Sequence, residues 1–211
     1  MTTSLKTEAG AVAPRPGLRP SAVFLDRDGT LIEEVGYLDR QERIELFPWA
    51  VEAIRAFNRA NLPVVVVTNQ SGIARGFFTE AVVDQVHRRI EEMLRAGGAT
   101  IDAYYYCPHH RHGSVPQYAV ACDCRKPGLG MVERAVREFG VDPAQSFTVG
   151  DRWLDVELAR ASGAKGVLVR TGYGAREERQ PQPGLAADAV VDNLIEAASW
   201  ILETLRRPAR T

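Results

Sequence analysis

The segment "SAVFLDRDGT" (residues 21–30) sets the pattern from which the fold of this chain is predicted. A short apolar run ends at Asp26, Asp28 follows two residues later, and Gly29 allows a sharp turn. Such a run is typical of a buried strand with a functional group at its carboxyl end. Similar runs that end in polar residues recur in "LPVVVVTNQSG" (62–72) and "SFTVGD" (146–151).

Candidate strands alternate with candidate helices along the rest of the chain. Further strands are expected in "AYYYC" (103–107), in "KGVLVRTG" (165–172) and at residues 187–192. Helices with one apolar face are expected at residues 50–57, 82–94, 131–139 and 154–159. We expect Thr79 to cap the second of these helices, and Gly140 and Gly163 to end the last two. The alternation predicts an α/β fold, a Rossmann-like three-layer sandwich with a central parallel sheet.

The composition limits the class of protein. The 211 residues fit one domain, which we place at residues 21–207, after an N-terminal arm of residues 1–20 that we expect to be flexible. Hydrophobic residues make up 45% and charged residues 25% of the chain, as in ordinary globular proteins, and the net charge of -1 does not point to nucleic acid. No apolar run approaches the ~20 residues of a membrane helix, and the N-terminus lacks the apolar core of a secretory signal.

The cysteine pattern indicates the compartment. All three cysteines lie between residues 107 and 124, which does not resemble a secreted disulfide framework. We therefore expect a reducing, cytoplasmic compartment. The modest size of the chain favours a monomer, and the charge and hydropathy favour a small-molecule substrate without a membrane or nucleic-acid partner.

The first strand end carries two carboxylates two residues apart. Asp26 and Asp28 repel each other unless a cation or a shared proton lies between them. Mg²⁺ suits this pair, because it prefers oxygen ligands and is usually held by few carboxylates together with a substrate phosphate. For this pair alone, an acidic turn without a function is the alternative.

Residues at other strand ends favour a metal site over an acidic turn without a function. Asp151 ends a third strand, with Asp155 one helical turn further on. Because the carboxyl ends of parallel strands share one edge of a sheet, these carboxylates are expected to meet and to need a cation. Thr68 and Lys126 offer a hydroxyl and an ammonium group for a phosphate. The combination predicts a phosphoryl-transfer site.

Four segments, "FLDRDGT", "VVVVTN", "CRKP" and "VGDRWLD", resemble the four motifs of the haloacid dehalogenase (HAD) superfamily of phosphotransferases, in the same order. The resemblance implies that Asp26 takes the phosphoryl group as an aspartyl-phosphate and that Asp28 acts as general acid and base. It implies that catalytic Mg²⁺ is held by the Asp26 carboxylate, the Asp28 backbone carbonyl and the Asp151 carboxylate. Thr68 and Lys126 would bind the phosphoryl oxygens.

A second candidate metal site lies in "CPHHRHGSVPQYAVACDCRKPG". Its four expected ligands for a structural Zn²⁺ are Cys107, His109, Cys122 and Cys124. His110 and His112 are rival ligands, and free buried cysteines or a redox pair are the alternatives to zinc. Four protein ligands leave no open position for a catalytic water, so we expect a structural site. Such a site would fix the backbone that carries Arg125 and Lys126.

This zinc-binding loop resembles a subgroup of the superfamily whose members act on small phosphate esters, without a large cap domain. By that resemblance His109 rather than His110 binds zinc, and the substrate pocket is lined by Glu34, Tyr37, Thr68, Asn69, Gln70, Ser71, Arg125 and Lys126. Arg125, and with it Arg75, would hold a second, distal phosphate, although a solvent-facing Arg75 is an equal alternative. Two segments, "RKPGLGM" and "EEVGY", depart from the pattern of the subgroup and leave the anomer preference open.

The sequence thus predicts a magnesium-dependent phosphatase for a small sugar bisphosphate. The length of the loop from residue 107 to residue 122 favours this activity over a histidinol-phosphate phosphatase, whose loop is typically shorter. A zinc-stapled phosphate-binding module is the non-enzymatic alternative, but a binding module has no need of a nucleophile. A phosphatase of DNA ends would be expected to show a basic strip with interleaved aromatics, which the sequence does not show.

Overall fold

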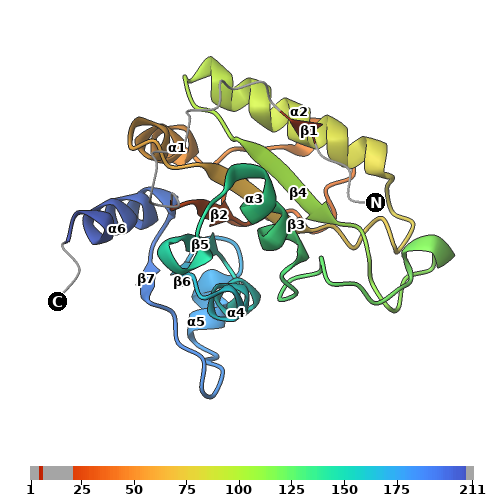
Figure 1. The fold of residues 1–211 in the computed structure, drawn as a ribbon. Helices are drawn as coiled ribbons and strands as arrows, with labels where there is room; N and C mark the ends of the chain where they lie inside the picture. Colours follow the sequence, from red (N-terminus) through yellow and green to blue (C-terminus); the bar gives the residue numbers. More distant parts are fainter. Residues whose placement is uncertain (1–4, 7–20, 208–211) are drawn as a thin grey trace.

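A seven-stranded sheet lies at the centre of the computed structural model, which describes residues 5–6 and 21–207 (Figure 1). Its strands are β1 (Leu5–Lys6), β2 (Val23–Leu25), β3 (Val64–Asn69), β4 (Ala103–Cys107), β5 (Phe147–Gly150), β6 (Lys165–Val169) and β7 (Ala189–Val191). The order is β1-β4-β3-β2-β5-β6-β7, with β1 antiparallel to β4 and every other pair parallel. The predicted parallel sheet is therefore confirmed for β2 to β7. The strand β1 was not predicted, and the rest of the expected arm, residues 1–4 and 7–20, lies outside the described residues.

In the described part of the chain, five α-helices connect the strands and a sixth, α6, follows the last strand. They are α1 (Ala50–Arg59), α2 (Glu80–Ala96), α3 (Gly130–Phe139), α4 (Trp153–Ser162), α5 (Gly174–Glu178) and α6 (Leu194–Arg206). The four predicted helices are confirmed, and α5 and α6 are additional. As predicted, Gly140 and Gly163 end α3 and α4, both in the left-handed conformation that glycine adopts without steric cost. Thr79 does occupy the cap position of α2, but its side chain makes no capping hydrogen bond.

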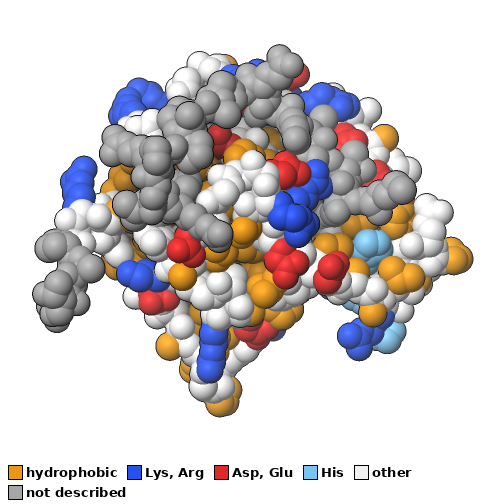
Figure 2. Space-filling view, viewed as in Figure 1, with side chains coloured by type: hydrophobic (Ala, Val, Ile, Leu, Met, Phe, Trp, Pro, Cys, Tyr) orange, Lys and Arg blue, Asp and Glu red, His pale blue; other side chains and the backbone are white. Residues whose placement is uncertain are grey.

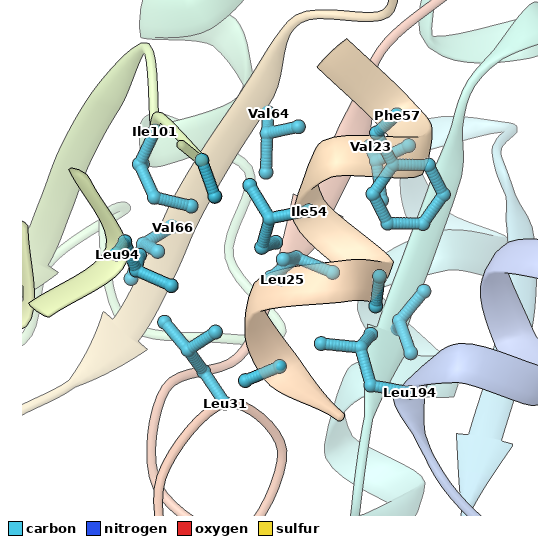
Figure 3. Close-up of a cluster of buried hydrophobic side chains, with 14 of the residues drawn as sticks. Val23, Leu25, Leu31, Ile54, Phe57, Val64, Val66, Leu94, Ile101 and Leu194 are labelled. Carbon is cyan, nitrogen blue, oxygen red and sulfur yellow. The ribbon is translucent and has the colours of Figure 1, made fainter. Parts of the chain in front are cut away.

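Helices cover both faces of the sheet, as the three-layer prediction requires. One face packs on α1, α2 and α6 through a core that includes Val23, Leu25, Ile54 and Phe57 (Figure 3). The opposite face packs on α3 and α4 through residues such as Phe24, Met131 and Leu158. Neighbouring residues of β2 and β3 point to opposite faces, so a strand that is buried on both sides reads as a continuous apolar run. This is why the apolar runs in the sequence locate the strands well.

The chain reverses its direction of progress across the sheet at β2. From β2 it proceeds to β3 and β4 on one side, and then crosses over to β5, β6 and β7 on the other. Leu25 pairs with Val66 of β3 and with Val149 of β5, so the ends of these three strands lie side by side. Ligands of open α/β sheets bind at such a switch point. The strands β2, β3 and β5, which carry three of the predicted motifs, therefore deliver their polar residues to one place.

The connections that begin at this edge hold little secondary structure. Residues 26–63 hold only the 3-10 helix η1 (Gln41–Arg43) and α1, and residues 108–129 hold η2 (Pro116–Tyr118). A further short 3-10 helix, η3 (Pro143–Gln145), precedes β5. The expected absence of a large cap domain agrees with these lengths across residues 21–207. Over the described residues, no helix combines the length and the apolar character that a bilayer span requires.

Candidate active site

A cavity of about 290 Å³ opens at the carboxyl ends of β2, β3 and β5. With the exception of Arg75, the residues predicted for catalysis, magnesium binding or substrate binding line it: Asp26, Asp28, Glu34, Tyr37, Thr68, Asn69, Gln70, Ser71, Arg125, Lys126 and Asp151. The lining also includes residues for which no role was predicted: Gly36, Gly72, Phe78, Arg152, Leu154, Asp155 and Tyr173. Residues from segments more than a hundred positions apart thus share one site.

Three buried carboxylates crowd the floor of this cavity. Oxygen atoms of Asp26, Asp151 and Asp155 lie within 4.8 Å of one another. Lys126 Nζ donates to Asp26 Oδ1 at 2.7 Å and to Asp155 Oδ1 at 2.6 Å. Burial, together with the charges of the neighbouring carboxylates, raises the pKa of Asp26 to about 7 and that of Asp151 to about 8. One ammonium group does not balance three carboxylates. The cluster therefore favours a further cation.

The donor atoms fit a hard divalent cation such as Mg²⁺. Asp151 Oδ2 accepts from the backbone N–H of Tyr173 at 2.7 Å, whereas Oδ1 is buried and has no hydrogen-bond partner. A Cβ atom at Gly29 or Gly172 would come within 2.2 Å of Asp151 Oδ2, so only glycine leaves room for this carboxylate. An orphaned carboxylate oxygen next to Asp26 is what a site for an oxygen-seeking cation requires.

Lys126 is held in place from two sides. Its backbone N–H donates to Asn69 Oδ1 at 3.0 Å, and Asn69 Nδ2 donates to the Lys126 carbonyl at 3.3 Å. Asp155 fixes the ammonium group, and its other oxygen accepts from the backbone N–H of Arg152 at 3.3 Å. Asn69, predicted to line the substrate pocket, therefore also fixes the loop that carries Lys126. The sequence placed Asp155 one helical turn after Asp151 but assigned it no role.

The Asp28 side chain is not part of the carboxylate cluster and has other partners. Its Oδ2 accepts from Gln70 Nε2 at 2.8 Å, and Gln70 Nε2 also donates to Thr68 Oγ1 at 2.9 Å. Arg27 contacts both carboxylate oxygens of Asp28. Asp28 lines the cavity without joining the group of carboxylates that could hold a metal. This arrangement is compatible with the expectation that only its backbone carbonyl contributes to the magnesium site.

The second candidate metal site forms where the sequence predicts it. The ligand atoms of Cys107, His109, Cys122 and Cys124 lie within 4.8 Å of one another. The sulfur–sulfur distances are 3.2, 3.4 and 3.5 Å, and His109 Nδ1 lies 3.3 Å from Cys124 Sγ. Around a tetrahedral zinc ion with Zn–S bonds of about 2.3 Å, such atoms would be about 3.8 Å apart. Three thiols and one imidazole at this spacing could hold a metal.

The rival histidines and Arg75 lie elsewhere. His110 Nε2 is 3.3 Å from Arg75 Nη2, and His110 Nδ1 accepts from the backbone N–H of His112. Arg75 is not part of the cavity lining, so its predicted contact with a distal phosphate has no support in this structure. Arg125 lines the cavity, and its Nη1 donates to the His109 carbonyl at 3.2 Å. A hydrogen bond thus connects the Cys/His cluster directly to Arg125, which lines the cavity.

The loop that carries Glu34 and Tyr37 is held by one arginine. Arg43 donates to the carbonyls of Val35 and Tyr37 at 3.1 and 3.2 Å, and to Asp39 Oδ1 at 2.9 Å. The ring of Tyr37, which lines the cavity, meets the Phe77 ring edge-on at 4.5 Å between centroids. Arg43 therefore sets the position of a loop that lines the cavity.

We expect Arg43→Ala to raise the KM for the phosphate-ester substrate by roughly three- to tenfold. The loop carries two predicted substrate-binding residues, and each hydrogen bond from Arg43 stabilises it by about 0.5–1.5 kcal/mol. The value of kcat should change less, since Arg43 is remote from the carboxylate cluster. Arg59→Ala, which removes another surface ion pair, serves as the control. The measurement is the steady-state kinetics of the two variants. A KM for Arg43→Ala equal to that of Arg59→Ala would contradict the role of Arg43 in positioning the loop.

A sheet of this topology with a carboxylate-lined cavity at its switch point agrees with the fold of a HAD-like hydrolase. The HAD-hydrolase-like family matches residues 123–197, and the polynucleotide kinase 3 phosphatase family matches residues 22–155. D-glycero-D-manno-heptose-1,7-bisphosphate 7-phosphatase of Thermosynechococcus vestitus is 40% identical over 89% of this chain and 96% of its own length. The D-glycero-β-D-manno-heptose-1,7-bisphosphate 7-phosphatase of Escherichia coli K12 is 41% identical over 90% of this chain and 97% of its own.

A solved structure agrees with these relatives. The D,D-heptose 1,7-bisphosphate phosphatase of B. bronchiseptica, crystallised with magnesium and phosphate, is 31% identical and has a TM-score of 0.77. The match covers 87% of this chain and 99% of that one. The chain belongs to this family of HAD-like phosphatases, the heptose-1,7-bisphosphate 7-phosphatases. The superfamily predicted from the four motifs is confirmed.

Proposed function

We propose that this chain is a magnesium-dependent phosphatase that removes the 7-phosphate of D-glycero-D-manno-heptose 1,7-bisphosphate and leaves heptose 1-phosphate. The observation that carries the proposal is the buried group of Asp26, Lys126, Asp151 and Asp155, with one carboxylate oxygen free for a cation. The choice of substrate rests on relatives of that activity with about the same length and 40–41% identity.

Asp26 acts as the nucleophile in this proposal. A carboxylate oxygen of Asp26 forms a bond to phosphorus while the bond from phosphorus to the sugar oxygen breaks, and Asp28 gives its proton to the leaving alkoxide. Water then attacks the phosphorus of the aspartyl-phosphate, Asp28 accepts a proton from that water, and the bond to Asp26 breaks to release phosphate. Thr68 and Lys126 bind the phosphoryl oxygens throughout, and Asp155 orients Lys126.

The Mg²⁺ ion would be held by the carboxylates of Asp26 and Asp151 and by the backbone carbonyl of Asp28. When bound, it neutralises the charge of the transferring phosphoryl group and of the crowded carboxylates. This assignment is supported by the orphaned oxygen of Asp151, and by the magnesium and phosphate found with the B. bronchiseptica relative.

The rest of the cavity suits a sugar carrying a second phosphate. Arg125 is well placed for the distal phosphate, because it lines the cavity and a guanidinium group can make two parallel bonds to phosphate. Glu34, Tyr37 and the segment 68–71 supply polar groups for the sugar hydroxyls. Acidic and basic side chains are interspersed on the face in Figure 2, where the described residues show no continuous basic strip of the kind that a nucleic acid needs.

For the Cys/His cluster, we propose a structural Zn²⁺ bound by Cys107, His109, Cys122 and Cys124. Three thiolates and a neutral imidazole leave the ion with a net charge of about -1, which makes it a poor electrophile and a good cross-link. The cluster lies directly before Arg125 and Lys126 in the chain. Histidine side chains reach the surface at the right edge of Figure 2, where Figure 1 places the loop between β4 and α3.

Cys122→Ser is expected to lose the bound zinc, to lower the midpoint of thermal unfolding, and to reduce kcat/KM at saturating Mg²⁺. A loss of about 3 kcal/mol would correspond to roughly 6–12 °C for a chain of this size. Zinc content, thermal unfolding and kinetics of the purified variant check this. Full stability together with full activity in zinc-free Cys122→Ser would contradict a structural role.

The proposed substrate is tested by comparing kcat/KM for several phosphate esters with Mg²⁺ present. We expect the highest value for heptose 1,7-bisphosphate, and lower values for fructose 1,6-bisphosphate, histidinol phosphate and an oligonucleotide with a terminal 3′-phosphate. The last compound addresses the match to the polynucleotide phosphatase family, which is confined to residues 22–155. A preference for any of the other three would redirect the assignment.

We also propose that residues 21–207 act as a single catalytic domain and that the enzyme is a cytoplasmic monomer. A reducing compartment suits the proposed zinc site, since its three cysteines must remain thiolates to bind the metal.

A further inference from the structure

An arginine between the two motif aspartates is almost fully buried. The Arg27 side chain is 1% exposed, although a guanidinium group keeps its charge in any environment. Burying such a charge is costly unless it is paired and hydrogen-bonded. Its partners therefore indicate why the chain places an arginine here rather than an apolar residue.

The guanidinium group of Arg27 grips the carboxylate of Asp28. Arg27 Nη2 donates to Asp28 Oδ1 at 2.9 Å, and Nε lies 3.2 Å from both oxygens. Gln70 Nε2 completes the set with its bond to Oδ2 at 2.8 Å. Contacts to both oxygens leave the carboxylate little freedom to rotate, while 16% of the Asp28 side chain stays exposed beside the cavity.

The other end of the guanidinium group meets a buried histidine on α2. Arg27 Nη1 lies 3.2 Å from His87 Nε2, and the His87 side chain is buried. Burial, and next to it the charge of Arg27, lowers the pKa of His87 well below its ordinary value. A neutral His87 can therefore accept a hydrogen bond from Arg27. Its ring also stacks on Tyr104 of β4 at 4.8 Å, which fixes the plane of the imidazole.

We propose that Arg27 and His87 are positioning residues for catalysis: His87 orients Arg27, and Arg27 holds the Asp28 carboxylate where it exchanges protons with the substrate oxygen and with water. Neither residue lines the cavity, so neither is expected to touch the substrate. The inference rests on the proposed function, because it assumes that Asp28 is the general acid and base. It extends the site through Arg27 to α2, a helix for which no role in the reaction was predicted.

The test compares two substrates whose leaving groups differ in their need for a proton. The alkoxide of heptose 1,7-bisphosphate needs an acid, whereas p-nitrophenoxide leaves without one. Because kcat/KM reports the first chemical step, a defect in proton delivery lowers it selectively for the alkoxide. For Asp28→Asn we expect a loss of about 100-fold or more with the heptose substrate and of only about threefold with p-nitrophenyl phosphate.

Matched variants separate positioning from packing. His87→Met removes the acceptor for Arg27, whereas His87→Gln keeps an acceptor at similar reach, and both lose the aromatic stacking. Arg27→Met removes the charged fork, and Arg27→Lys keeps the charge without the fork. We expect Arg27→Met to follow Asp28→Asn, His87→Met to lose about tenfold with the heptose substrate only, and His87→Gln to stay within about threefold of the unmodified enzyme.

The outcomes distinguish the inference from the proposed function. A selective loss in Asp28→Asn without one in Arg27→Met and His87→Met would overturn the positioning role and leave the mechanism standing. Equal losses with both substrates in Asp28→Asn would overturn the role of Asp28 itself, and the inference with it. Should Arg27→Met fail to fold, the His87 pair decides, with thermal unfolding as the measure of intact structure.

Discussion

Asp26→Asn is expected to reduce phosphate release by at least about 10⁴-fold, because an amide cannot form the aspartyl-phosphate and removal of a nucleophile costs that much or more in enzymes that use one. The neighbouring carboxylates offer no replacement. Asp155 is occupied by Lys126 and by the backbone of Arg152, and Asp151 is fixed by Tyr173 and proposed to bind Mg²⁺. The measurement is phosphate release from heptose 1,7-bisphosphate with Mg²⁺.

The fold should survive this substitution. Asp26 is buried among like charges, so a neutral side chain of the same size relieves repulsion even as it weakens the contact with Lys126. Circular dichroism and thermal unfolding close to those of the unmodified protein would show this. Asp192→Asn, which changes an exposed aspartate, is the matched control. Retained turnover in a folded Asp26→Asn protein would contradict the mechanism.

Lys126→Met is expected to affect both activity and stability. It removes the only basic side chain within hydrogen-bond distance of Asp26 and Asp155 in the described structure, and leaves three buried carboxylates unbalanced. Breaking a buried ion pair from one side costs about 3–5 kcal/mol, which corresponds to a fall in the unfolding midpoint of roughly 6–20 °C. We also expect kcat/KM to fall by about 10³-fold, since a cation at the transferring phosphoryl group is lost.

Thermal unfolding of Lys126→Met should be measured without added Mg²⁺, because a bound cation would mask part of the loss. The control is Lys165→Met, which changes an exposed lysine at the start of β6. If Lys126→Met were as stable as Lys165→Met, the carboxylate cluster would not be held together by charge. If it were as active, Lys126 would not contact the phosphoryl group.

The chemistry of the site could be predicted because its parts lie at strand ends. A strand buried on both faces gives a continuous apolar run, and the residue after it is easy to locate, as at Asp26, Thr68 and Asp151. The parallel arrangement then brings these ends together at the switch point beside β2. The closely spaced cysteines likewise locate the second cluster without knowledge of the fold.

Contacts between side chains distant in sequence could not be predicted in this way. Nothing in the sequence pairs Arg27 with His87 across sixty positions, or shows that Asp155 turns towards Lys126. The sequence leaves Arg75 as either a second cation for a distal phosphate or a solvent-facing residue, and in the structure its guanidinium group lies next to His110. These placements depend on how the loops pack, and loop packing leaves no periodic signal.

Three elements of the fold, α6, β1 and α5, are not predicted from the sequence, for two different reasons. The residues Leu194, Ala197, Ala198 and Ile201 of α6 do have helical spacing and could have revealed that helix. The strand β1 has two residues and α5 has five, too few for any periodic pattern to appear. None of the three supplies a carboxylate to the cluster in the cavity, which is built from the ends of β2 and β5 and the start of α4.

The central claim is that the chain removes the 7-phosphate of heptose 1,7-bisphosphate in a reaction that needs Mg²⁺. Phosphorus NMR of the reaction tests it most directly, because the two phosphate esters give separate signals. We expect the 7-phosphate signal to be replaced by that of inorganic phosphate while the 1-phosphate signal persists, and no change when Mg²⁺ is left out. Loss of the 1-phosphate signal first, or two unchanged signals in the presence of Mg²⁺, would contradict the account.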